Sequence, residues 1–131
     1  MEDIETILKN SKTIAVVGLS DRQGRPSYLV ASYLLEQGYG IIPVNPNISE
    51  WRGIRAYRSL SEVKEKVDIV DIFRKREHVP GIVDEAIKIG AKVVWMQLGV
   101  ANQEAAEKAR AAGLKVVMNR CINIEHSKLN P

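Results

Sequence analysis

The sequence is poor in the residues that build disulfides, metal centres and membrane spans. It has one cysteine, Cys121, and two histidines, His78 and His126, among 131 residues. A single cysteine excludes an internal disulfide and a cysteine-built metal site, and no H-x₃-H pair or acidic cluster offers another. The apolar runs are much shorter than the roughly 20 residues that a membrane-spanning helix needs. We therefore predict neither a metal site nor a membrane segment.

An excess of charge of one sign is also missing. The chain carries 19 basic and 16 acidic residues, a net charge of +3, and contains no block of five like charges. A nucleic-acid interface would require a clustered basic face, so no nucleic-acid partner is expected. Met1 is followed by the acidic Glu2 and Asp3, unlike a secretory signal. These features are typical of a cytoplasmic protein.

Short apolar, β-branched segments alternate with segments of helical periodicity along the whole chain. This alternation favours a parallel sheet covered by helices on both faces, and the length suits one domain. We predict an α/β fold: a single doubly wound, Rossmann-like parallel sheet over residues 1–131, of strand order 3-2-1-4-5-6. Strands are expected at residues 13–17, 39–44, 67–73, 92–96 and 115–118, and helices at 3–9, 26–37, 79–89, 102–112 and 124–129, with Asp3 and Asn102 as candidate caps.

The third strand of this order is expected to be short. Residues 48–60 have no sustained period, so we predict only a brief edge strand near residues 55–57. A capped helical turn should follow, from Ser59 or Ser61 to Val63. Pro43 cannot donate a ladder hydrogen bond, and we therefore expect it at the end of its strand.

The segment TIAVVGLSDRQGRPSYLVASY, residues 13–33, predicts an anion site. Gly18 ends the first strand and allows a sharp turn, and Pro26 suits the first position of the following helix. A loop between a strand and a helix N-terminus presents unpaired N–H groups and the positive end of the helix dipole to the same place.

This loop differs from the dinucleotide fingerprint G-x-G-x-x-G. It reads GLSDRQG, is longer, and carries Arg22 and Arg25. The acidic residue that favours NAD at the end of the second strand is replaced by Asn45 and its neighbours. Both differences favour a nucleotide with an extra phosphate on its ribose, for which coenzyme A and NADP both qualify. The alternative is that both arginines are solvated loop residues.

Ligands of such sheets lie beyond the carboxyl ends of the strands. The residues that follow the predicted strands are amides, cations, one thiol and one aromatic ring, with no acid–base pair and no histidine, so we predict no catalytic residues. These positions are Gly18, Leu19, Ser20, Asn45, Pro46, Phe73, Arg74, Lys75, Gln97, Leu98, Gly99, Asn119, Arg120 and Cys121.

Five segments together resemble those of a known family: VVGLSDRQGRPSYLVA, IIPVNP, VDIVDIFRK, AKVVWMQLGV and VVMNRC. Over roughly residues 10–125 the chain is similar to the small single-domain CoA-binding proteins. These are related to the nucleotide-binding domain at the N-terminus of the succinyl-CoA synthetase α-subunit. The resemblance implies a Rossmann-like domain that binds coenzyme A. The ligase's phosphohistidine segment and partner subunit have no counterpart here, so ligase activity is not expected.

The resemblance also implies roles for individual residues. Gly18, Leu19 and Ser20 would meet the pyrophosphate, and Arg25 and Ser27 would complete that loop. Asn45 and Pro46 would border the adenosine end, Phe73 and Arg74 the next edge, and Met96 and Gln97 the pantetheine arm. The full predicted set is Gly18, Leu19, Ser20, Arg22, Arg25, Pro26, Ser27, Asn45, Pro46, Phe73, Arg74, Met96, Gln97, Asn119, Arg120 and Cys121.

Some residues admit two interpretations. Cys121 could form a mixed disulfide with the thiol of coenzyme A, or be a small, partly buried filler. Asp71 interrupts an apolar strand and should pair with an arginine or a backbone N–H, with a ligand-facing role as the alternative. Trp51 would cover either the adenine edge or a partner surface.

Three further side chains receive single predictions. Asp68 is expected at the exposed start of its strand. His78 is expected at the surface or as a helix cap, and His126 at the surface.

We therefore predict a protein that binds coenzyme A or an acyl-CoA without catalysing a reaction. The alternatives are an NADP-linked oxidoreductase and a nucleotide-sensing regulatory protein. A homodimer stays an open expectation, because small doubly wound domains often leave an apolar edge.

Overall fold

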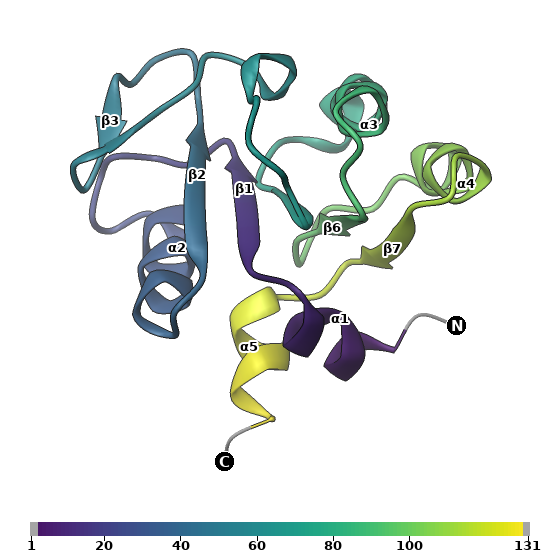
Figure 1. Cartoon of the computed structure of the whole chain (residues 1–131), viewed down its shortest axis with the longest axis horizontal. Helices are drawn as coiled ribbons and strands as arrows, with labels where there is room; N and C mark the ends of the chain where they lie inside the picture. Colours follow the sequence, from purple (N-terminus) through teal and green to yellow (C-terminus); the bar gives the residue numbers. More distant parts are fainter. Residues whose placement is uncertain (1–2, 130–131) are drawn as a thin grey trace.

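A five-stranded parallel sheet forms the centre of the molecule (Figure 1), in a computed structural model that describes residues 3–129. The strands lie in the order β2-β1-β5-β6-β7 and all neighbours are parallel. This confirms the predicted doubly wound arrangement, because the first strand pairs with both the second and the next long strand of the chain. The strands are β1 (Thr13–Val17), β2 (Gly40–Val44), β5 (Ile69–Ile72), β6 (Val93–Met96) and β7 (Lys115–Met118).

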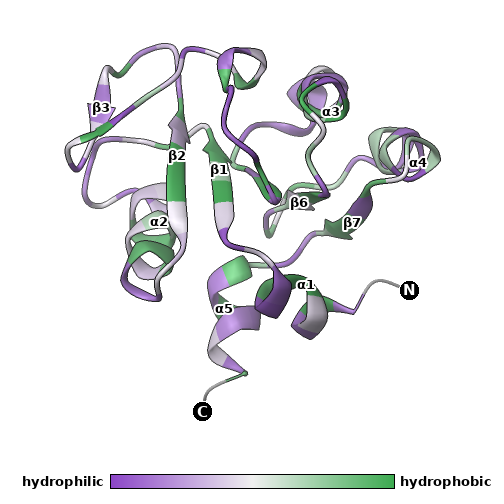
Figure 2. Cartoon of the chain, in the orientation of Figure 1, coloured by the Kyte–Doolittle hydropathy of each residue, from purple (hydrophilic) through white to green (hydrophobic). Residues whose placement is uncertain are grey.

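Helices cover both faces of the sheet, as Figure 1 shows. One core layer lies between the sheet and α3 and α4, and the other between the sheet and α1, α2 and α5. The strands are therefore hydrophobic over much of their length (Figure 2), as buried parallel strands must be. The helices are α1 (Ile4–Asn10), α2 (Pro26–Glu36), α3 (Val79–Lys88), α4 (Gln103–Ala111) and α5 (Ile122–Ser127).

The predicted third strand is reduced to one bridge, between Val44 and Tyr57. The preceding residues form a separate antiparallel hairpin, β3 (Glu50–Trp51) with β4 (Ile54–Arg55). Arg52 and Gly53 between them have φ values of 51° and 81°. Two positive φ values in succession are typical of the two-residue turn that returns the chain at once. Residues 50–55 therefore pair with each other in the hairpin and do not add a strand beside β2.

Two expectations about this region are corrected. Pro43 lies inside β2, not at its end, but β2 is an edge strand and the Pro43 carbonyl accepts a hydrogen bond from the Tyr57 N–H on the side away from β1. The missing N–H therefore costs no bond between long strands. Trp51 is 1% exposed and packs edge-on against Tyr28, with 5.5 Å between ring centroids. It is a core residue, so it presents no surface to a ligand or a partner.

Two helices, α1 and α4, begin at residues whose side chains cap them. The Asp3 carboxylate accepts hydrogen bonds from the N–H groups of Glu5 and Thr6 at the start of α1. Asn102 accepts one from the Ala105 N–H at 3.0 Å, as predicted for α4. The predicted helical turn after Ser59 is the short helix η1 (Leu60–Glu62), and a second short helix, η2 (Arg76–His78), precedes α3.

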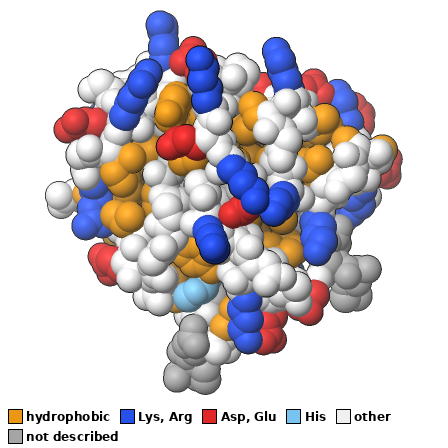
Figure 3. All heavy atoms as spheres, viewed as in Figure 1, with side chains coloured by type: hydrophobic (Ala, Val, Ile, Leu, Met, Phe, Trp, Pro, Cys, Tyr) orange, Lys and Arg blue, Asp and Glu red, His pale blue; other side chains and the backbone are white. Residues whose placement is uncertain are grey.

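Charged side chains of both signs are spread over the face drawn in Figure 3, with uncharged ones between them. No helix within residues 3–129 has the length and the apolar character that crossing a membrane requires.

Candidate functional site

The carboxyl edge of the sheet is built around Gly18, which directly follows β1. Its φ is +89°, and a Cβ placed on it would lie 2.5 Å from the Phe73 carbonyl oxygen. A position with so little space and a left-handed φ accepts only glycine. The sequence predicted that Gly18 allows a sharp turn; the structure adds that its missing side chain lets the loop after β1 lie against the loop after β5.

The loop between Gly18 and Pro26 is held by two serines. The Ser27 hydroxyl accepts a hydrogen bond from the Ser20 N–H at 2.9 Å, and the Ser20 hydroxyl accepts one from the Arg22 N–H at 3.1 Å. The Gly18 N–H donates to the Val44 carbonyl at 2.8 Å. Two of the three loop N–H groups expected to meet the pyrophosphate are therefore used within the protein. The Leu19 N–H has no such partner within the described chain.

Further free donors lie at the N-terminus of α2. Its capping residue, Arg25, makes no side-chain capping bond, and its first turn contains no acidic residue. The helix dipole and the N–H groups of this first turn are therefore uncompensated, which favours an anion. Pro26 at the first helical position confirms the predicted start of this helix.

A cavity of about 280 Å³ opens directly at this helix end. Two arginines and no acidic residue line it, and neither Arg22 nor Arg25 forms an ion pair with any described residue. Unpaired arginines beside an uncapped helix N-terminus form a strongly anion-attracting site. We call this the phosphate cavity; its lining residues are Gly18, Ser20, Arg22, Arg25, Pro26, Ser27 and Phe73.

A second cavity, of about 340 Å³, lies on the β2 side of Gly18 and includes Arg74. Asn45 lines this cavity and is fixed by two hydrogen bonds. Its side-chain amide donates to the Leu19 carbonyl at 2.9 Å, and its side-chain carbonyl accepts from the Asn47 N–H at 2.8 Å. Asn45 thus joins the end of β2 to the loop after β1. We call this the β2 cavity; its lining residues are Gly18, Asn45, Pro46, Asn47 and Arg74.

A third and larger cavity, of about 550 Å³, lies next to the phosphate cavity, on the side away from the β2 cavity. Pro26 and Phe73 belong to the walls of both. Gln97 is 5% exposed, and its side-chain carbonyl accepts a hydrogen bond from the Ile122 N–H at 3.0 Å. We call this the apolar cavity; its lining residues are Pro26, Val30, Phe73, Arg74, Lys75, Gln97, Leu98, Gly99, Val100, Cys121 and Ile124.

Four predicted site residues occupy less accessible or more distant positions. The side chains of Leu19 and Met96 are fully buried in the two core layers. The Asn119 side chain accepts from the Gly99 N–H at 2.7 Å and thereby joins the loops after β6 and β7. The Arg120 guanidinium lies 3.6 Å from the Glu125 carboxylate. None of these four lines the three cavities at this edge.

Sequence reasoning missed three residues of the apolar cavity's wall. These are Val30, Val100 and Ile124, and they come from α2, the loop after β6 and α5. The exposure that distinguishes Ile124, 50%, is known only from the structure. Only the packing of these three segments brings them together.

Asp71 contradicts the prediction that its carboxylate pairs with an arginine or a backbone N–H. It is fully buried in β5, beside Val16 of β1 and Trp95 of β6, and neither of its oxygens has a hydrogen-bond partner. It does not line the three cavities at the carboxyl edge either. Burial without a partner raises the pKa of Asp71 well above its ordinary value. Burial therefore favours the neutral carboxylic acid over the carboxylate at this position.

Asp68 and His126 are buried rather than exposed, against expectation. Desolvation acts to raise the pKa of Asp68, but hydrogen bonds from the N–H groups of Lys12 and Thr13, together with the charges of Lys92 and Lys66, lower it overall. His126 is 8% exposed, its Nδ1 lies 2.8 Å from the Tyr33 hydroxyl, and burial lowers its pKa. His78 is exposed at the start of α3, as predicted.

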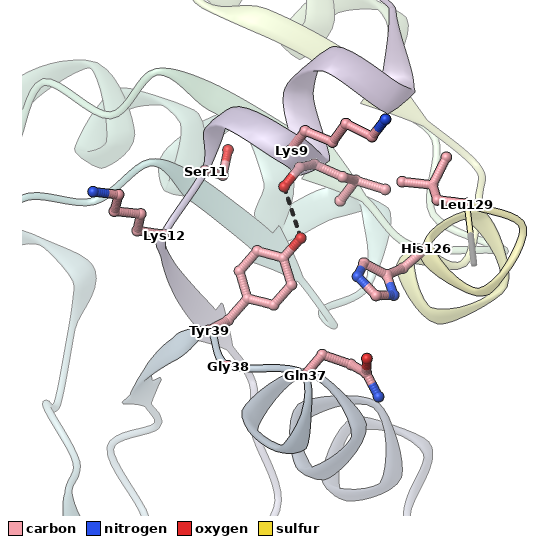
Figure 4. A pocket seen from close by; sticks show the side chains of 9 residues that line it. Lys9, Ser11, Lys12, Gln37, Gly38, Tyr39, His126 and Leu129 are labelled. Carbon is pink, nitrogen blue, oxygen red and sulfur yellow. Dashed lines mark hydrogen bonds between the residues drawn. The ribbon is translucent and has the colours of Figure 1, made fainter.

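A cavity of about 490 Å³ at the opposite edge has a different chemistry (Figure 4). It lies between the C-terminal ends of α1, α2 and α5, with Tyr39 and His126 in its wall. Helix C-termini carry the negative end of the dipole and disfavour anions. Lys9 beside it is paired with Glu5 at 2.7 Å. The arrangement of helix ends therefore favours the carboxyl edge as the anion site.

The chain matches one family model and several known proteins. A family model described as a CoA binding domain matches residues 12–127. The uncharacterized protein YneT of Bacillus subtilis (strain 168) is 44% identical over 125 residues, which cover 95% of this chain and 93% of YneT. A solved structure described as a hypothetical protein from Pyrococcus horikoshii OT3 has a TM-score of 0.95 at 44% identity, covering 98% and 91% of the two chains.

A larger relative contains a similar region as one part. The alpha subunit of acetate–CoA ligase (ADP-forming) I of Pyrococcus furiosus is 31% identical over 126 residues. The match covers 84% of this chain and 27% of the ligase subunit. The chain therefore corresponds to about a quarter of that subunit.

Proposed function

The chain belongs to the CoA-binding domain family, and from this premise we propose that it binds coenzyme A along the carboxyl edge of its sheet. The observation that carries the proposal is the phosphate cavity. The uncapped N-terminus of α2 and the unpaired Arg22 and Arg25 converge on a space that no carboxylate lines. This is the environment that a diphosphate requires.

The three adjoining cavities suit the three parts of the ligand. The diphosphate would meet the first turn of α2 and the Ser27 hydroxyl, since the Gly18 and Ser20 N–H groups are already bonded. The phosphorylated adenosine would lie in the β2 cavity, where Arg74 provides a further cation. The pantetheine arm would pass Pro26 and Phe73 into the apolar cavity.

We propose a binding role without a chemical step. The walls of the three cavities contain no histidine and no carboxylate that would transfer a proton. Because the chain spans only 27% of the ligase subunit that it resembles, acyl-group activation would depend on parts absent from this sequence. Presenting or holding coenzyme A is the function that the site supports best.

Calorimetric titration tests the proposal. Coenzyme A should bind more tightly than dephospho-CoA, NADP or ATP, because the ligand must supply a diphosphate, a ribose phosphate and an arm. Tighter binding of NADP would favour the oxidoreductase, and tighter binding of ATP a nucleotide sensor. Native mass spectrometry of freshly purified protein should show copurified coenzyme A, and the same spectra report whether the expected homodimer forms.

A matched pair of variants locates the site. R25A should weaken binding of coenzyme A at least about tenfold, the effect of losing one charge-assisted phosphate contact. K88A removes the same charge from the exposed end of α3, where no ligand cavity of the carboxyl edge lies. It should bind like the wild type. Equal affinities for R25A, K88A and the wild type would refute a site at the phosphate cavity.

A further inference from the structure

The outer part of the apolar cavity exposes large aliphatic side chains to solvent. Exposed large hydrophobic residues are few in the described chain: Leu29, Leu98 and Ile124. Two of these three, Leu98 at 63% and Ile124 at 50% exposure, line this one cavity. Val30 and Val100 extend the same wall. Aliphatic side chains from three separate segments therefore converge on one space.

The ligand's arm would enter this cavity from the phosphate cavity. The two cavities share Pro26 and Phe73, so they lie next to each other. The charged members of the apolar cavity, Arg74 and Lys75, are both cations, and no carboxylate lines it. Arg74 also belongs to the β2 cavity on the other side of Gly18, so it lies between the two spaces.

We propose that the protein prefers acyl-CoA thioesters with an uncharged, aliphatic acyl group over free coenzyme A, and that the acyl group occupies the outer part of the apolar cavity, at Leu98 and Ile124, beyond the end of the pantetheine arm. This inference rests on the proposed binding of coenzyme A. A volume of about 550 Å³ is in the range of surface clefts that hold small molecules. An acyl chain there would cover the exposed parts of Leu98 and Ile124, which free coenzyme A leaves in water.

The chemistry of the wall sets the expected preference. Each methylene group moved from water into an apolar space gains about 0.8 kcal/mol, which corresponds to about fourfold in affinity. A carboxylated acyl group would lose hydration against the aliphatic side chains. Of the two cations in this wall, Arg74 is assigned to the phosphorylated adenosine and Lys75 is exposed to solvent, so neither offsets that loss fully. The wall therefore selects by chain length among uncharged acyl groups and disfavours a charged end.

Titration with coenzyme A and its acetyl, butyryl, hexanoyl and succinyl thioesters tests this preference. The dissociation constant should fall by up to about fourfold per methylene from acetyl to hexanoyl, and succinyl-CoA should bind more weakly than butyryl-CoA. Equal affinities along the series, or tighter binding of succinyl-CoA, would overturn the inference and leave binding of coenzyme A intact. If coenzyme A itself fails to bind, the proposed function falls as well.

Variants at exposed positions keep the test independent of folding. L98Q and I124Q should each reduce the ratio between the dissociation constants of coenzyme A and hexanoyl-CoA several-fold. L29Q is the matched control, because Leu29 is 57% exposed but lines none of the three cavities at this edge. It should keep the wild-type ratio. A ratio lowered equally by L29Q and L98Q would refute the assignment of the acyl group to this cavity.

Discussion

The carbonyl oxygen of Phe73 fills the space where residue 18 would carry its Cβ, at 2.5 Å from that position. The contact joins two loops that are more than fifty residues apart in the sequence. It fixes the edge of the phosphate cavity, to which both Gly18 and Phe73 belong.

We therefore expect G18A to be destabilising. The left-handed φ costs about 1–2 kcal/mol for a non-glycine residue, and displacement of Phe73 adds to this, so the free energy of unfolding should fall by about 2 kcal/mol or more. Urea unfolding measures it. G24A in the same loop is the control: a Cβ at Gly24 meets nothing within 4 Å, so the change should stay within about 1 kcal/mol. Equal effects of the two variants would contradict the close approach.

Asp71 should make the protein less stable as the pH rises. Its raised pKa means that the folded state keeps a proton that the unfolded state releases near pH 4. Above that pH, each further pH unit lowers the free energy of unfolding by at most about 1.4 kcal/mol, until the pH reaches the raised pKa of the folded state. D71N removes the titrating group, so its stability should depend less on pH from about 4 upwards. Urea unfolding as a function of pH measures the difference, and an unchanged pH profile would show that Asp71 is ionised in the fold.

His126 should make the protein less stable as the pH falls into the mildly acidic range. Burial lowers its pKa in the fold, so the unfolded state takes up a proton first when the pH falls below about 6.5. Its contribution to stability is present above that value and is lost as the pH falls toward the lowered folded pKa. H126Q keeps a polar group near the Tyr33 hydroxyl but does not titrate. H126Q should remove the loss of stability below about pH 6.5 that His126 causes. Comparing the pH dependence of the free energy of unfolding for H126Q, D71N and the double variant separates the two contributions.

Cys121 provides a chemical probe of the proposed orientation of coenzyme A. It is partly exposed in the apolar cavity. With the disulfide of coenzyme A, its thiolate would attack one sulfur, form a protein–CoA mixed disulfide and release one coenzyme A thiol, so no other oxidant is needed. Mass spectrometry should show this adduct in the wild type and not in C121S. Glutathione disulfide, which lacks the nucleotide, should react much more slowly; equal rates would contradict guidance by the phosphate cavity.

Much of the fold was predictable from local features. The strands at residues 13–17 and 115–118 have the predicted bounds, because a run of β-branched residues indicates a strand buried on both faces. Asp3 and Asn102 were recognisable as helix caps, and both accept the expected hydrogen bonds. The short third strand was expected from the irregular sequence. Its replacement by a hairpin was not, because the turn at Arg52 depends on a backbone conformation that the sequence only weakly indicates.

The position of the candidate site was predictable from the sequence, but the backbone N–H groups that are free to bind an anion there were not. The rule for parallel sheets placed it at the strand ends, and Arg22, Arg25 and Ser27 do line one cavity there. Which N–H groups are free depends on hydrogen bonds such as that from Ser20 to Ser27. A sequence pattern does not contain them.

What the sequence by itself determined is the alternation of strands and helices, and with it the edge where a ligand would bind. Both follow from local propensities and from the topology that parallel strands require. Only the tertiary structure decided that Asp71 is buried without a partner and that Leu98 and Ile124 share one cavity. Burial and contact depend on which distant segments pack together, and that packing is a property of the whole chain.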